Sequence, residues 1–205
     1  FGADLEAALA FGPGSFQILL VRPPAEGRGD LRVLEVRRGE VDAGALEEAG
    51  VAALRGLSPR PRKVHVALPH DSHVLATVSL PPLPAKEQPQ ALRWKLAKLC
   101  NFPAEESLLA FRRAASPGSV LGLMARRAVI LQAVGMVERA GLPVGRVLAP
   151  GQSLACLLPP GTGQEARALL HIGRESAQLY VFSGGEMTFS RDLGVSVRHW
   201  LEVLK

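Results

Sequence analysis

The chain has 205 residues, of which 47% are hydrophobic, and it carries two cysteines and a formal net charge of +5. A chain of this length buries roughly 70% of its unfolded surface, so one or two ordinary domains need no disulfide scaffold. Cys100 and Cys156 each close an apolar helical stretch, which favours buried thiols in a reducing compartment over a disulfide bridge or a metal pair.

The positive charge by itself raises the possibility of nucleic-acid or anionic-membrane binding. The basic residues, however, occur as scattered pairs with acids between them, and aromatic residues make up only 5% of the chain. A solvated surface explains this distribution better, and a basic nucleic-acid binder is an alternative. The chain begins with Phe1, shows no leader pattern and has no apolar run near the length of a membrane span, so we expect a soluble protein.

The first predicted elements are three strands and a helix. Apolar runs at residues 5–11 and 15–21 flank a tight Gly-Pro-Gly stretch and predict a β-hairpin. A third strand is predicted at 31–37, where apolar residues occupy both parities, so we expect it to be covered on both faces. Helical spacing follows at 43–57, with Asp42 as the N-cap.

A second group of elements begins after a proline-containing linker at 59–62. Strands are predicted at 63–68 and 74–80, followed by a proline-rich edge and a helix at 86–100. That helix places Leu92, Leu96 and Leu99 on one apolar stripe, which predicts that it covers a sheet.

The next part of the chain predicts two more strands and a long helix. The strands are expected at 108–113 and 119–125, joined by the turn at 115–118. The helix is expected at 127–140, with Ile130, Ala133, Val134 and Val137 on its densest apolar stripe, and Gly141 stands where a C′ glycine belongs. A short strand at 144–148 and a short helix at 152–158 follow.

The clearest linker is the Pro-Pro-Gly-Thr-Gly stretch at 159–163, after which the opening pattern returns. Strands are predicted at 168–172, 177–182 and 187–191, and a helix begins at Ser196. The order strand, strand, strand, helix therefore occurs twice. Internal duplication of this kind predicts two related lobes.

A twice-used β-β-β-α unit with a glycine turn between its first two strands resembles the plan of the actin-like ATPases. Within that superfamily the chain is similar to platform proteins of type IV pilus assembly (the PilM type) and of type II secretion (the GspL type). Three stretches carry the resemblance: a Leu-Pro-x-Leu element, charged helix and Phe-Pro-x-Glu-Glu exit at 80–106, the segment at 120–158, and the segment at 168–196.

The resemblance implies a fold class and a domain plan. We expect an α/β, actin-like (RNase H-like) protein whose first lobe spans 1–160 and carries an inserted α+β subdomain at about 69–125. The start of a second lobe would occupy 161–205, and this lobe would be incomplete.

In the actin-like family, the two hairpin turns hold the nucleotide phosphates and an acid ends the first strand of each hairpin. The positions that match the phosphate turns here are Gly12, Gly14, Ser15, Gly173 and Ser176. The acids are replaced by Ala10 and His171, and Pro13 lacks an N–H. We therefore expect no ATPase activity and no cofactor, with an ATP-binding switch as the alternative.

Other candidate residues have plainer explanations. His171 could act as a phosphate ligand or an acid/base, but a lone histidine at a strand end is more often structural. His65, His70 and His73 lie close to Asp71, but their spacing is not that of a zinc site, so no metal is expected. Ser15 and Ser176 are equally well explained as turn residues.

The resemblance implies that the chain is a non-catalytic scaffold at the cytoplasmic face of the inner membrane. It would bind the cytoplasmic tail of a membrane-spanning partner in a groove near the inserted subdomain and relay to an assembly ATPase. Contact with the membrane itself would come only through partners or through a segment beyond Lys205. Trp94 falls off the apolar stripe of its helix, so Trp94 and the adjacent Arg93 are the candidate partner-binding residues.

Overall fold

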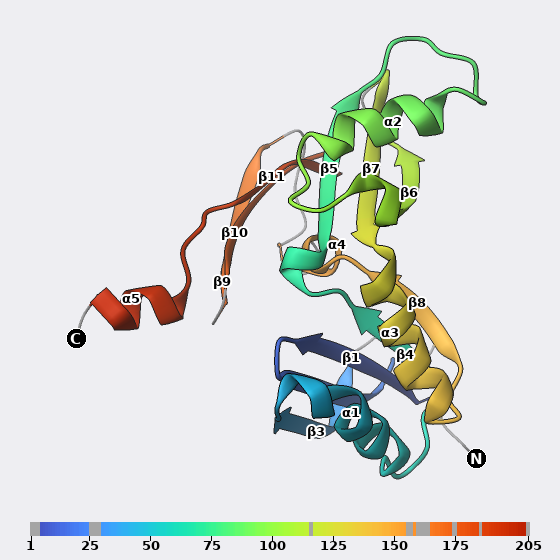
Figure 1. The fold of residues 1–205 in the computed structure, drawn as a ribbon, viewed down its shortest axis with the longest axis vertical. Helices are drawn as coiled ribbons and strands as arrows, with labels where there is room; N and C mark the ends of the chain where they lie inside the picture. The colour runs from blue at the N-terminus through green and yellow to red at the C-terminus, as the bar shows by residue number, and fades with distance from the viewer. Residues whose placement is uncertain are drawn as a thin grey trace. The chain divides into compact units, whose positions relative to one another are not determined.

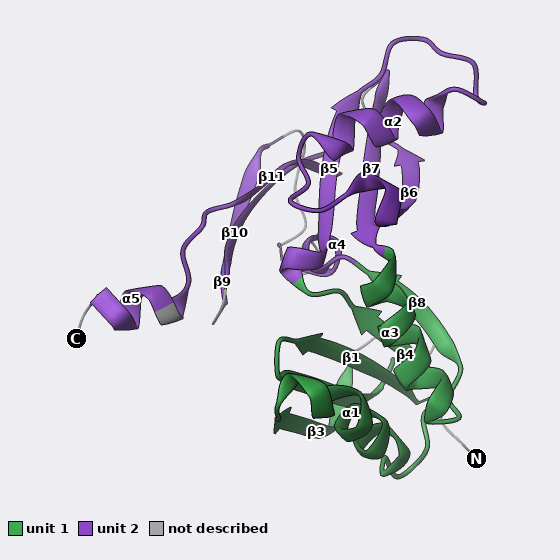
Figure 2. Ribbon diagram, in the orientation of Figure 1, with its two compact units in different colours: residues 1–69, 127–148 green, residues 70–126, 149–205 purple. Residues whose placement is uncertain are grey.

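The chain forms two compact units, each built from two stretches of sequence (Figure 2). Unit 1 comprises Phe1–Pro69 and Arg127–Leu148, and unit 2 comprises His70–Arg126 and Ala149–Lys205. The structure is a computed structural model, and it describes residues 5–24, 30–114, 117–154, 158, 165–173, 176–184 and 186–203. The predicted linker at 159–163, the predicted lobe boundary at 160 and Cys156 lie outside the described residues.

Unit 1 is built on a five-stranded mixed sheet with the strand order β3-β2-β1-β4-β8 (Figure 1). The strands are β1 (Glu6–Gly12), β2 (Ser15–Arg22), β3 (Arg32–Glu40), β4 (Lys63–Ala67) and β8 (Val144–Leu148). β2 runs antiparallel to both of its neighbours, β1 and β3, whereas β4 lies parallel to both β1 and β8. The predicted opening hairpin is confirmed, and it closes through the pair Gly12 and Ser15.

Two helices supply the helical part of the unit 1 core. They are α1 (Leu46–Arg55), which follows the 3-10 turn η2 (Ala43–Ala45), and α3 (Arg127–Arg139). Alternate residues of β1, β2 and β4 pack with the apolar stripes of both helices in one buried cluster. Its members include Leu9, Ile18, Leu54, Met136 and Val137. Because α3 belongs to the second stretch of unit 1, this core joins residues that are far apart in the sequence.

Two expectations for the first 60 residues are wrong. The predicted third strand is not covered on both faces, because β3 is an outer strand of the sheet and Val33 and Val36 are 54% and 47% exposed. The α-helix starts at Leu46 and not at 43, and Asp42 makes no side-chain capping hydrogen bond. The three residues before Leu46 form the tighter 3-10 turn, which is common at helix starts.

The first sheet of unit 2 is antiparallel, with the strand order β5-β7-β6. Its strands are β5 (His73–Ser79), which follows the 3-10 turn η3 (His70–Ser72), β6 (Ser107–Arg113), which follows η4 (Ala104–Glu106), and β7 (Ser119–Arg126). The helix α2 (Gln88–Ala97) packs on one face, where Leu92 and Leu96 meet Val120 and Met124. The predicted stripe is wrong at Leu99, which is 56% exposed because α2 ends two residues earlier.

The second sheet of unit 2 has the order β11-β10-β9 and is also antiparallel. Its strands are β9 (Arg167–Ile172), β10 (Ala177–Ser183) and β11 (Glu186–Asp192), and the helices of this part are α4 (Pro150–Leu154) and α5 (Val197–Val203). β11 lies along β5, where Thr77 Oγ1 donates to Met187 O at 2.5 Å and Ser190 Oγ donates to Leu75 O at 2.6 Å. The order strand, strand, strand, helix therefore recurs as predicted.

The core between the two sheets of unit 2 is apolar. Leu75 and Leu121, from the face of the first sheet opposite α2, pack with Tyr180, Phe182 and Met187 of the second sheet. β7 is thus covered on both faces, which explains why its apolar residues do not keep to one parity.

Candidate functional site

The first glycine turn lies in unit 1 and is held against the segment after β3. Gly14 has a φ of +70°, and its carbonyl accepts a hydrogen bond from Val41 N at 2.8 Å. A side chain at Gly14 would meet the Val41 carbonyl at 2.8 Å, so both the backbone angle and the space require glycine. Ala10, where the resemblance expects an acid, is exposed and carries no charge.

The second glycine turn lies in unit 2, between β9 and β10. Gly173 N donates to Ser176 O at 2.8 Å, and Gly173 O accepts from Val197 N at 3.1 Å. The Gly173 amide is therefore already paired within the turn. A phosphate held there would need other N–H groups, so the assignment of Gly173 and Ser176 to phosphate binding stays a prediction.

His171 packs against a second histidine of unit 2. The ring centroids of His171 and His70 are 5.0 Å apart with an angle of 35° between the planes, and both Nδ1 atoms are buried without a hydrogen-bond partner among the described residues. Burial lowers the pKa of His70 below its ordinary value, and His171 lowers it further, whereas Gln178 and Asp192 act in the opposite direction.

Burial disfavours the charged form of His70, the imidazole that packs against His171. Burial, together with Asp192, raises the pKa of the nearby Tyr180 to about 12, so the phenol stays neutral as well. Tyr180 Oη donates to the side-chain oxygen of Gln178. His171 therefore lies beside a His70 ring whose neutral form is favoured, and it supplies no carboxylate of the kind that magnesium prefers.

His65 has a structural partner in unit 1. Its Nε2 lies 2.9 Å from Glu6 Oε2, and Lys63 Nζ lies 2.8 Å from Glu6 Oε1. These contacts lower the pKa of Glu6, chiefly through the hydrogen bond from Lys63, with desolvation opposing them. The three groups link β1 and β4, which are parallel neighbours in the sheet.

The two candidate partner-binding residues on α2 have different surroundings. The Trp94 side chain is 75% exposed, and the Lys98 ammonium lies 6.0 Å from the centroid of its ring. Arg93 is half-buried, and its Nη1 donates to Ala104 O at 2.7 Å and to Ser107 Oγ at 3.1 Å. Trp94 is therefore open to a partner, whereas the guanidinium of Arg93 ties α2 to η4 and β6.

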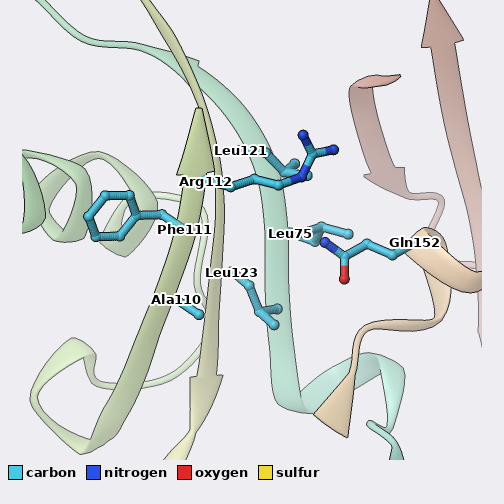
Figure 3. Close-up of a pocket in the computed structure, with 7 residues that line it drawn as sticks. All are labelled: Leu75, Ala110, Phe111, Arg112, Leu121, Leu123 and Gln152. Atoms are coloured by element: carbon cyan, nitrogen blue, oxygen red, sulfur yellow. The ribbon is translucent and has the colours of Figure 1, made fainter. Parts of the chain in front are cut away.

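The structure adds a hollow that the sequence did not predict. It has a volume of about 190 Å³ and lies within unit 2 against the sheet face opposite α2 (Figure 3). Its lining is mostly apolar and consists of Leu75, Ala110, Phe111, Arg112, Leu121, Leu123 and Gln152. At its rim, Arg112 Nη1 donates to Glu186 Oε1 at 2.8 Å. Leu75 on β5 and the alternating Leu121 and Leu123 on β7 were a signal for a second buried face. They do not show where the packing on that face ends.

No helix among the described residues is long and apolar enough to cross a bilayer. No protein-family model matches the sequence, and no curated protein matches it.

Solved structures, by contrast, match along nearly the whole chain. The chain is similar to a PilM–PilN type IV pilus biogenesis complex, with a TM-score of 0.71 and 22% identity over 96% of this chain and 63% of that one. It is also similar to the cytoplasmic domain of EpsL, an inner-membrane component of the type II secretion system of Vibrio cholerae, with a TM-score of 0.63 and 17% identity over 98% of this chain and 74% of that one.

A third match is a Bacteroides thetaiotaomicron protein with an actin-like ATPase fold, at a TM-score of 0.58 and 10% identity over 98% of this chain and 76% of that one. These similarities show that the chain has the actin-like fold, as the resemblance implied. The chain spans less than two thirds of the PilM-type chain that it matches.

Proposed function

We propose that this chain is a non-catalytic scaffold in the inner-membrane platform of a type IV pilus or type II secretion machine. It acts on the cytoplasmic side and binds the cytoplasmic tail of a membrane-spanning partner. The observation that carries the proposal is the fold similarity over at least 96% of the chain to a PilM–PilN complex and to the EpsL cytoplasmic domain.

Two features of unit 2 support partner binding. The hollow of about 190 Å³ is lined by apolar side chains, and a cavity of about 150 Å³ is large enough for a benzene ring, so one large apolar side chain fits. On α2, the exposed Trp94 offers a second contact, because exposed aromatic residues are enriched at interaction sites. An assembly ATPase is a further candidate partner of the platform.

The direct test of the scaffold function is titration calorimetry with a synthetic peptide. The peptide carries the cytoplasmic tail sequence of the PilN-type protein from the same organism, and a scrambled peptide of identical composition is the control. We expect saturable binding of the native sequence and none of the scrambled one. Absence of binding by the native peptide would contradict the proposed function.

The chemistry of the two turns supports a role without ATP turnover. Ala10 and His171 provide no carboxylate for a magnesium ion, and the Gly173 amide is already paired. An ATP-binding switch that uses Gly12, Gly14 and Ser15 is the alternative function. It would raise the unfolding midpoint in Mg-ATP, because ligand at 100 times Kd adds about 2.7 kcal/mol of stability. We expect no shift with millimolar Mg-ATP, and a shift of several degrees would favour the switch.

A further inference from the structure

The strand β6 is an outer strand of its sheet. β7 pairs with β5 on one side and with β6 on the other, and no other strand among the described residues pairs with β6 (Figure 1). The last four residues of β6, at 110–113, are all exposed. An outer strand directs alternate N–H and C=O groups away from its sheet, so β6 offers backbone hydrogen bonds that its own sheet does not use.

The middle of β6 is little protected, although side chains bond to the backbone at its two ends, where Arg93 Nη1 donates to Ser107 O at 3.3 Å and Arg112 Nη1 donates to Arg113 O at 3.4 Å. The strand has no proline, its register with β7 is regular over seven residue pairs, and its charges stand only at its end, at Arg112 and Arg113. The outer strand of unit 1 is different, because β3 carries charges along its length and its pairing with β2 shifts register at Leu20 and Val21. Charges and bulges discourage added strands, so the edge of β6 is the more open of the two.

The side chains of β6 divide between two surfaces. Ala110 lies opposite Leu123, which in turn lies opposite Leu75, so Ala110 and Arg112 share the sheet face that carries the hollow. Figure 3 shows the Phe111 side chain pointing away from Leu75 and Leu123. A strand added to β6 would therefore place every second side chain on the side of the hollow and the others beside Phe111, which is 45% exposed.

The two ends of β6 carry opposite charges. Glu105 and Glu106 stand just before β6, Arg112 and Arg113 stand at its end, and the apolar residues 108–111 lie between them. Arg112 is paired with Glu186, whereas no acidic partner of Arg113 is found in the described part of the chain. An added strand is complementary if an acid at one end of its apolar middle lies opposite Arg113.

We propose that β6 binds the partner tail as an added β-strand, with an apolar tail residue in the hollow and an acidic tail residue at Arg113. This inference rests on the proposed function, because it names the strand at which the tail binds and the backbone hydrogen bonds through which it binds. Strand addition obtains affinity from main-chain hydrogen bonds and specificity from alternate side chains.

The test of the backbone mode is an N-methyl scan of the tail peptide against the full chain. In an added strand, every second peptide N–H donates to β6, and the N–H groups between them point to solvent. We expect methylation to weaken binding about tenfold at alternate positions and hardly at all between them, as the loss of one hydrogen bond predicts. A loss without this period of two would contradict strand addition.

Two variants test the side-chain contacts. Phe111→Ala and Arg113→Glu should each weaken peptide binding about fivefold, and a peptide with lysine in place of its acid should restore binding to Arg113→Glu. Arg32→Glu on the exposed edge of β3 is the matched control and should leave the affinity unchanged. Both β6 side chains are exposed, so unchanged unfolding midpoints would show that the variants are folded.

The outcomes separate the two proposals. A tail peptide that does not bind overturns both the proposed function and the strand-addition inference. A tail peptide that binds, but responds neither to alternate N-methylation nor to Phe111→Ala and Arg113→Glu, overturns strand addition at β6 and leaves the proposed function standing.

Discussion

At the scale of single residues, the histidine at position 171 changes the chemistry of the second glycine turn. An aspartate there would bring a charge, whereas His171 brings an aromatic ring that packs on His70. The titratable and polar groups around this pair, in addition to the two rings, are Asp71, His73, Gln178, Tyr180 and Asp192. Burial outweighs the acids, so the neutral form of His70 is favoured in the folded chain.

The lowered pKa of His70 predicts a pH dependence of stability. The unfolded chain binds a proton at His70 near the ordinary pKa of 6.5, whereas the folded chain binds it only at lower pH. The free energy of unfolding should therefore fall as the pH drops below 6.5. His70→Asn should flatten this dependence in urea titrations between pH 7 and about pH 5. His199→Asn, at an exposed position of α5, should keep the dependence of the native chain.

At the scale of elements, the contact between α2 and β7 depends on a glycine. A side chain at Gly122 would come within 2.8 Å of Leu96 Cδ1 and 3.1 Å of Leu92 Cδ1. Leu92 and Leu96 are both fully buried, and Arg93 anchors the same helix through its hydrogen bonds to Ala104 and Ser107. The helix therefore lies close to the sheet, with little room for a larger residue in β7.

We expect Gly122→Val to destabilise unit 2 even though valine favours strands. The added methyl groups overlap the two leucines, and overpacking of this kind costs about 1–3 kcal/mol. Gly135→Ala in α3 is the control, because a side chain there meets nothing within 4 Å and alanine gains about 0.5–1 kcal/mol in a helix. Chemical denaturation should give opposite signs for the two variants, and a stable Gly122→Val would refute the close packing.

At the scale of the whole molecule, unit 1 is discontinuous in sequence. Its second stretch contributes α3 and β8, and Met136 and Val137 complete the core formed by β1, β2, β4 and α1. Polar contacts link the same stretches, since Arg139 bonds to Glu47 at 3.0 Å and Arg55 Nη2 donates to Arg139 O at 2.7 Å. The core that covers the first strands therefore includes residues more than 100 positions later in the sequence.

This packing predicts the effect of truncating Met136, which is 1% exposed. Met136→Ala should cost about 2–5 kcal/mol and should speed amide exchange in β1 and β2. Leu131→Ala in the same helix is the control, because Leu131 is 60% exposed and should change little. Exchange in β1 that is unaffected by Met136→Ala would mean that the first stretch of unit 1 is stable without α3.

Local patterns determined a large part of this structure. Glycine and proline residues located the opening hairpin and the turn at Gly141, and apolar periodicity identified β4, α1 and α3 within a few residues. The substitutions at Ala10 and His171 are visible from the order of residues alone. These features are local, because steric limits on φ and the periods of 3.6 and 2 act between near neighbours.

Only the tertiary structure decided which surfaces remain open. The sequence of β3 looked like a strand covered on both faces, and Leu99 looked like a core residue, yet both are exposed. The edge of β6, the hollow beside it and the inward hydrogen bonds of Arg93 also depend on which strand lies outermost and which helix ends first. Periodicity states which residues share a face, but burial of that face depends on elements brought there from distant parts of the chain.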